Sequence, residues 1–171
     1  MLKDLGLLSV SLAAAYTAWR CAAGQRERRT VLSALLSDIS LLKLEICERL
    51  LPLPEALEKL SKEKVPCLRA FFSACAKEIR TCENVPFSEI WSLHARKELS
   101  EKLGAEELEA AAELGRFLGR YEAGQQREEL EKAERRFEGF LRREQTQGAA
   151  RGRLKAAVSL CAGAVAVILM L

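Results

Sequence analysis

The chain has 171 residues, 49% hydrophobic and 30% charged, which is the size and average composition of about one folded domain. A net charge of only +3 and few aromatic residues argue against nucleic-acid binding. Its six cysteines show no paired C-x-x-C spacing, so we expect neither a disulfide framework nor a zinc site, but reduced thiols in a reducing compartment.

Both ends of the chain are apolar, because no charged residue lies between Leu5 and Trp19 or between Ala156 and Leu171. At ~1.5 Å per residue each stretch gives a helix of roughly 22–24 Å, which is short for the ~30 Å hydrocarbon core of a bilayer. Arginines and aromatic residues at the borders can make up the difference. The sequence therefore predicts transmembrane helices in residues 1–23 and 154–171, with a middle domain in residues 24–153.

The basic residues lie on the inner side of both apolar ends: Arg20, Arg26, Arg28 and Arg29 at the first, and Arg142, Arg143, Arg151, Arg153 and Lys155 at the second. Because Lys and Arg beside membrane segments tend to remain cytoplasmic, we expect a two-pass protein of the cell membrane with a cytoplasmic middle domain. The alternative for the first stretch is a cleaved signal peptide. Asp4 before the stretch and the arginines after it favour the membrane helix.

The first part of the middle region has the apolar spacing of helices. Residues three and four apart predict one buried face of a long helix: Val31, Leu32, Leu35, Leu36, Ile39, Leu42, Ile46 and Leu50. Pro52 and Pro54 end that helix, and Pro54, Pro66 and Pro86 stand where further helices can begin. Their expected inward positions are Leu68, Phe71, Phe72, Cys75 and Ile79, followed by Phe87, Ile90, Trp91 and His94.

The second part of the middle region is also helical in pattern. Residues 105–117 are rich in Ala, Glu and Leu, and we expect Glu106, Glu107 and Glu109 to face solvent. Gly115 either terminates this helix or permits the close approach of another helix. Residues 125–147 are highly charged around one narrow apolar seam, which should pack on the first long helix: Leu130, Ala133, Phe137, Phe140 and Leu141.

Together these patterns predict an all-α fold, a cytosolic helical bundle flanked by N- and C-terminal transmembrane helices. Hinge-like breaks are expected at Gly24 and at residues 148–152, between the bundle and the bilayer. No segment shows the two-residue alternation of a strand. There is a single histidine, His94, and no Walker, G-x-G-x-x-G, H-E-x-x-H or calcium-loop motif. We therefore expect no enzyme, cofactor, metal or small-molecule substrate.

The order of several motifs resembles a known family. After the first long helix come Pro52-Leu53-Pro54-Glu55-Ala56, then Phe71-Phe72, Trp91, Leu114-Gly115-Arg116-Phe117-Leu118-Gly119 and Gln125-Gln126, with an apolar segment at each end. In this order the chain resembles the stage III sporulation protein AB family of endospore-forming bacteria over essentially its full length. It departs from the family pattern at Leu114, where Phe is usual, and near Glu122, where Asp is usual.

That resemblance implies similarity to the F-type inner-membrane platform proteins of type II secretion and type IV pilus systems. It implies a non-enzymatic component of the transenvelope complex between mother cell and forespore, on the mother-cell side of the outer forespore membrane. The implied partners are the membrane and other stage III sporulation proteins, including a secretion-type ATPase, the AA protein. Our candidate partner-contact residues are Arg120, Glu122, Gln125, Gln126 and Arg127.

Two further hypotheses share the same architecture. One is a generic membrane-anchored helical adaptor of another secretion or cell-division assembly. The other is a periplasmic or secreted helical protein whose first apolar segment is removed.

Overall fold

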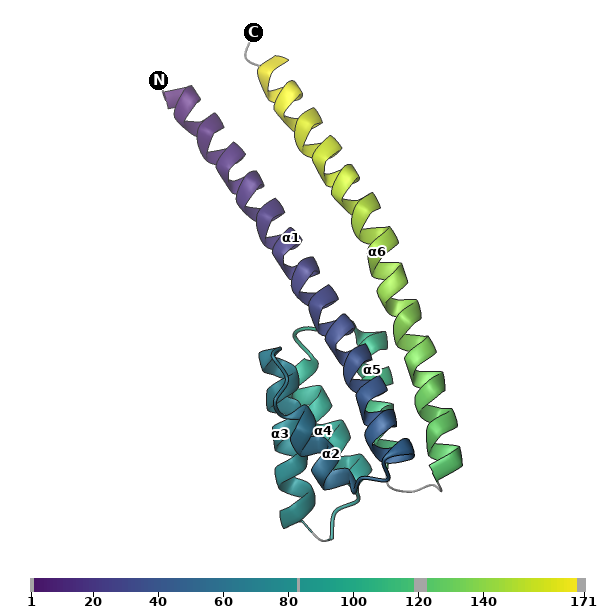
Figure 1. The fold of residues 1–171 in the computed structure, drawn as a ribbon. Helices are drawn as coiled ribbons and strands as arrows, with labels where there is room; N and C mark the ends of the chain where they lie inside the picture. Colours follow the sequence, from purple (N-terminus) through teal and green to yellow (C-terminus); the bar gives the residue numbers. More distant parts are fainter. Residues whose placement is uncertain (1, 83, 119–122, 169–171) are drawn as a thin grey trace. The chain divides into compact units, whose positions relative to one another are not determined.

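The structure is a computed structural model of the chain. It describes the backbone of residues 2–82, 84–118 and 123–168, and the side chains of residues 23–82, 84–118 and 124–146. Every element in these ranges is helical, as predicted (Figure 1). In chain order the elements are α1 (Leu2–Lys43), η1 (Leu44–Glu48), α2 (Leu53–Leu60), α3 (Pro66–Thr81), α4 (Phe87–Leu99), α5 (Ala105–Glu113), η2 (Leu114–Arg116) and α6 (Ala123–Ile168).

The chain divides into two compact units, the core unit of residues 28–141 and the terminal unit of residues 1–27 and 142–171. The terminal unit consists of the outer parts of α1 and α6, which run without a break through Gly24 and through residues 148–152. The predicted hinges at these positions are therefore wrong. A glycine inside a helix costs only about 1 kcal/mol, and good helix formers such as Ala22 and Ala23 surround it.

The predicted membrane segments fall mainly on residues whose side chains lie outside the described part of the chain. Their backbone is helical over residues 2–23 and 154–168. Among the residues that the structure describes, no helix is both long enough and apolar enough to cross a membrane. The two anchors and the domain limits that depend on them remain predictions.

The end of α1 enters the core unit with the predicted stripe inward: Val31, Leu32, Leu35, Ile39 and Leu42 are at most 2% exposed. After Lys43 the helix widens into the π-helical turn η1. Leu50 follows with a positive φ of 51° and a 71% exposed side chain, so its predicted inward position is wrong. The reason is that the wider turn and the left-handed residue end the 3.6-residue periodicity on which that prediction depended.

Helices α3 and α4 begin at Pro66 and Pro86, as predicted, whereas α2 begins at Leu53, one residue before the predicted Pro54. Pro52 precedes α2, Pro66 is the first residue of α3, and Pro86 precedes α4. The inward faces of α3 and α4 meet in an aromatic cluster, in which the Trp91 ring lies 4.7 Å from Phe71 and 5.7 Å from Phe87 between centroids. These short helices, with α5, pack beside the inner end of α1 (Figure 1).

Helix α5 is joined to α1 by a partly buried ion pair, in which the Glu107 side chain is buried and the Arg28 side chain is 34% exposed. The predicted exposure of Glu107 is wrong, since the residue is only 3% exposed. Its carboxylate accepts two hydrogen bonds from Arg28, at 3.0 Å from Nε and 2.7 Å from Nη2, and a third from the backbone N–H of Gly104 at 2.8 Å. Arg28, counted in the sequence among the membrane-facing basic residues, is therefore engaged inside the core unit.

Helix α6 contributes its predicted seam, with Leu130, Phe137 and Phe140 buried. The prediction that this seam packs on the first long helix is confirmed by the contacts at its borders. Lys43 of α1 forms an ion pair with Glu134, and Arg127 forms one with Glu48 of η1 at 2.9 Å. The hydrophobic core of the unit is thus built from one stripe on each of its helices.

Candidate interaction site

The predicted partner-contact residues do not form one described surface. Arg120 and Glu122 lie outside the described residues. Gln125 is exposed, and Arg127 is exposed but already paired with Glu48 and, at 3.5 Å, with Glu131. Gln126 is only 5% exposed, and its role as a contact residue stays a prediction.

Helical spacing explains the burial of Gln126. It lies four residues before Leu130, and therefore occupies the first position of the α6 seam. Its side-chain Nε2 has no hydrogen-bond partner within the described part of the chain. Extending the seam backward by one turn would have identified it from the sequence.

The described surface of the core unit contains instead a hollow at the N-terminal end of α4, which we call the apolar groove. It measures about 420 Å³ and is lined by Leu53, Ile79, Pro86, Phe87, Ser88, Gly115 and Leu118. These residues come from α2, α3, the start of α4, and η2 with the residues that follow it. A volume of this size lies within the range of roughly 300–1,000 Å³ that is typical of binding sites.

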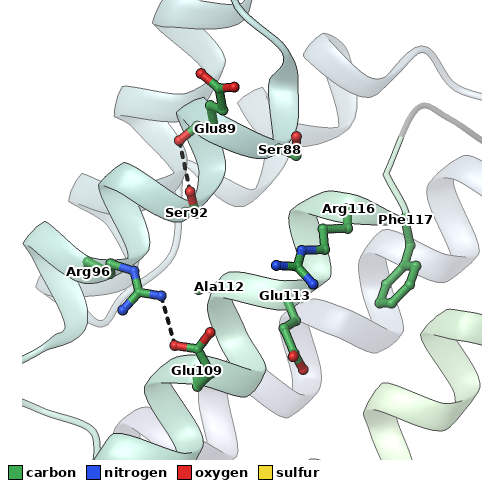
Figure 2. Close-up of a pocket in the computed structure, with 9 residues that line it drawn as sticks. All are labelled: Ser88, Glu89, Ser92, Arg96, Glu109, Ala112, Glu113, Arg116 and Phe117. Atoms are coloured by element: carbon green, nitrogen blue, oxygen red, sulfur yellow. Dashed lines mark hydrogen bonds and ion pairs between the residues drawn. The ribbon is translucent and has the colours of Figure 1, made fainter.

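A second hollow, the polar groove, adjoins the first at Ser88 and has a volume of about 410 Å³. It lies between α4 and α5 and is lined by Ser88, Glu89, Ser92, Arg96, Glu109, Ala112, Glu113, Arg116 and Phe117 (Figure 2). We refer to the two hollows together as the α4 groove.

Most charges of the polar groove are neutralised within the protein. Arg96 donates to the Glu109 carboxylate at 2.8 Å, across the space between α4 and α5 (Figure 2). Glu113 accepts from Arg136 of α6, also at 2.8 Å. Since all four side chains are at least one-third exposed, these pairs contribute little stability and leave the carboxylates and guanidinium groups accessible.

Gly115, which lines the apolar groove, packs closely against Trp91. The Trp91 indole is buried, and its Nε1 donates to the carbonyl oxygen of Ala111 at 2.7 Å. A Cβ atom on Gly115 would lie 2.6 Å from both Cβ and Cγ of Trp91. The close-approach interpretation of Gly115 is therefore the correct one, because only glycine allows η2 to lie against this ring.

Two side chains that could carry chemistry, His94 and Cys75, are buried in the core unit. His94 is buried as predicted, and its Nε2 lies 3.0 Å from Oε2 of Glu78. Burial, with a smaller contribution from the charge of Glu78, raises the pKa of the Cys75 thiol to about 12. A thiol held protonated is a poor nucleophile. Within the described residues, no three His, Cys, Asp or Glu side chains are placed to hold a metal ion.

A buried carboxyl group lies in the inward stripe of α1. Asp38 is 3% exposed, and one of its oxygens, Oδ2, has no hydrogen-bond partner among the described residues. Burial is the main cause that raises its pKa to about 8, and the neighbouring carboxylate of Glu63 adds to the shift. Asp38 is therefore largely protonated at neutral pH, which lets the two carboxyl groups coexist.

Glu45, about two helical turns further along the stripe, has the opposite environment. Its carboxylate accepts from Lys59 at 2.7 Å and from Arg49 at 2.8 Å. The hydrogen bond from Lys59 is the main cause that lowers its pKa, with a further contribution from Arg49. The charged form is thus favoured, and it ties η1 to α2.

Sequence reasoning missed the groove residues Ser92, Arg96 and Arg116. One signal was present, because the stretch from Leu114 to Gly119 that carries the family resemblance supplies Gly115, Arg116, Phe117 and Leu118 to the α4 groove. Leu53, from the Pro-Leu-Pro stretch, lines it as well. Two motifs that are distant in the sequence therefore meet at one surface.

Comparison with known proteins gives the family. The sequence pattern of the family described as stage III sporulation protein AB matches residues 3–171. No curated protein and no solved structure matched the chain. Because the match runs almost from end to end and agrees with the order of motifs along the chain, the chain belongs to the stage III sporulation protein AB family.

Proposed function

We propose that this protein is a non-enzymatic membrane component of the transenvelope complex between mother cell and forespore. It acts there as a platform between a cytosolic secretion-type ATPase and the membrane channel. The observation that carries the proposal is the family match over residues 3–171. The helical core unit, with ion pairs between helices and a groove lined by family motifs, supports a role in binding other proteins.

Membrane anchoring at both ends is part of the proposal, and its support is the sequence. The stretches from Leu5 to Trp19 and from Ala156 to Leu171 carry no charge, and arginines flank each on its inner side. This pattern favours a two-pass topology with the core unit on the cytoplasmic side. In a sporulating cell that side is the mother-cell cytoplasm at the outer forespore membrane.

Protease protection tests this topology. In sealed protoplasts of vegetative cells made to express the protein in the cell membrane, added protease should leave residues 28–141 intact, and it should digest them after detergent lysis, as followed with antibodies against the core unit. Digestion in sealed protoplasts would contradict the cytoplasmic orientation. Mass spectrometry of the mature N-terminus gives an independent check, because loss of residues 1–15 would indicate a cleaved signal peptide.

The platform role is tested by genetics and by copurification. Deletion of the gene should arrest sporulation at stage III, and the full-length protein should copurify with the secretion-type ATPase from crosslinked sporulating cells. Normal spore formation in the deletion strain would refute the proposal in favour of an adaptor for another assembly. Arrest without capture of the ATPase from any exposed crosslinking position would refute the ATPase-linked platform.

A further inference from the structure

One guanidinium group of the α4 groove stands apart from the other charges. Arg116 is exposed and forms no ion pair with any described residue, whereas Arg96, Glu109 and Glu113 are all paired. Its guanidinium points into the space between α4 and α5 (Figure 2). The remaining charge, Glu89, directs its carboxylate away from the other labelled side chains. Among the described residues, the groove therefore presents one positive charge without an ion-pair partner.

The apolar groove shares Ser88 with the polar groove that Arg116 lines. Gly115 and Leu118, on either side of Arg116 in the chain, belong to its wall together with Phe87. Its size suits a large apolar side chain, which would bury its surface against Phe87 and Leu118. Because the two hollows adjoin at Ser88, one short segment can reach both.

We infer that the α4 groove binds a segment of a partner protein in which an Asp or Glu lies within two residues of a large apolar side chain. The apolar side chain fills the apolar groove, and the carboxylate pairs with Arg116. Arginine is well suited to this task, because its planar guanidinium can bind a carboxylate through two parallel hydrogen bonds. The inference rests on the proposed function in one respect: the partner is another protein of the sporulation complex.

The test is photo-crosslinking with the full-length protein in sporulating cells. A photoreactive amino acid replaces Ser92, which lines the polar groove, and the crosslinked peptide is identified by mass spectrometry. The measurement is repeated with Arg116→Glu and with the matched control Arg135→Glu, an exposed arginine of α6 for which no ion pair is present among described residues. Thermal unfolding of each variant verifies that it is folded.

We expect the adduct to map to a segment with an acidic residue beside an apolar one. Arg116→Glu should reduce its yield roughly tenfold or more, the effect of losing one charge-assisted hydrogen-bonded pair, while Arg135→Glu leaves it unchanged. Reversing the charge of the mapped acidic residue to Lys should restore the adduct with Arg116→Glu. Restoration would separate direct pairing from a general effect of charge.

Other outcomes overturn the inference. Absence of an adduct, an adduct without an acidic residue, or equal yields from the folded variants would each show that Arg116 does not select the partner in this way. These results differ from failure of the proposed function, which is read from the deletion strain. If deletion arrests sporulation but the adduct is insensitive to Arg116, only the groove assignment is wrong.

Discussion

Replacement of Gly115 by alanine tests the tightest packing in the core unit. The added Cβ would lie 2.6 Å from Cβ and Cγ of Trp91 and 2.7 Å from its Cδ1. Carbon atoms in favourable contact are about 3.5–4.0 Å apart, so the ring or η2 has to move by about 1 Å. Trp91 cannot rotate away freely, because Phe71 and Phe87 pack against it and its Nε1 is bonded to Ala111.

The expected change in the free energy of unfolding for Gly115→Ala is the sum of opposing effects. Overpacking of this kind costs about 1–3 kcal/mol, and breaking the indole hydrogen bond would add about 1–3 kcal/mol for the buried donor. The higher helix propensity of alanine offsets at most about 1 kcal/mol. We therefore expect Gly115→Ala to lower the free energy of unfolding by about 2–4 kcal/mol, a decrease in Tm of roughly 10 °C.

The assay is thermal and denaturant unfolding of the full-length protein in detergent, followed by tryptophan fluorescence. The chain contains two tryptophans, so a Trp19→Phe background leaves Trp91 as the reporter. Gly139→Ala is the matched control, because nothing lies within 4 Å of a Cβ at this position of α6. It should stabilise the protein by about 0.5–1 kcal/mol. If Gly115→Ala stabilises the protein by a similar amount, the close approach of Trp91 and η2 is wrong.

Three further predictions concern buried and strained groups. The folded-state pKa of Asp38 is raised from 3.8 to about 8, so the free energy of unfolding should fall as pH rises from about 4 to about 8. Asp38→Asn should flatten this part of the pH profile, as measured by urea unfolding, and an unchanged profile would refute the assignment. Glu107→Gln should destabilise the protein by about 2 kcal/mol through loss of the partly buried pair with Arg28. Glu109→Gln, in an exposed pair, should cost under about 1 kcal/mol, and equal losses in chemical denaturation would contradict this. Leu50→Gly should leave the free energy of unfolding unchanged or raise it by up to about 1 kcal/mol, since glycine accepts the positive φ. A clear decrease in the thermal midpoint would mean that the exposed side chain contributes to the fold.

The local order of the fold was predictable because its signals are short in range. Prolines fix where α2, α3 and α4 begin, since proline is tolerated only in the first turn of a helix. Apolar residues three and four apart identify the buried face of each helix, and they correctly placed Leu35, Phe71 and Trp91 in the core. The family, too, could be recognised from the order of motifs along the chain.

Pairings between distant residues were not predictable, since periodicity within one helix does not identify the neighbour across it. Glu107 belongs to a charged run and was expected in solvent, but its partner Arg28 is 79 residues away in the sequence. Gln126 looked like a surface residue, yet it occupies a seam position. Leu50 followed the stripe by spacing, but the π-helical turn before it changed the direction of its side chain.

The sequence by itself determined the helical class, the helix starts beside the prolines, most of the buried stripes and the family, because each depends on local spacing or on the order of motifs. Only the tertiary structure decided that Gly115 serves close packing against Trp91 and that Arg116 faces a groove between α4 and α5. Both depend on segments that are distant in the chain meeting in space. The physical reason is that a groove and an ion pair between helices are properties of the packing between helices, which the pattern along one helix does not contain.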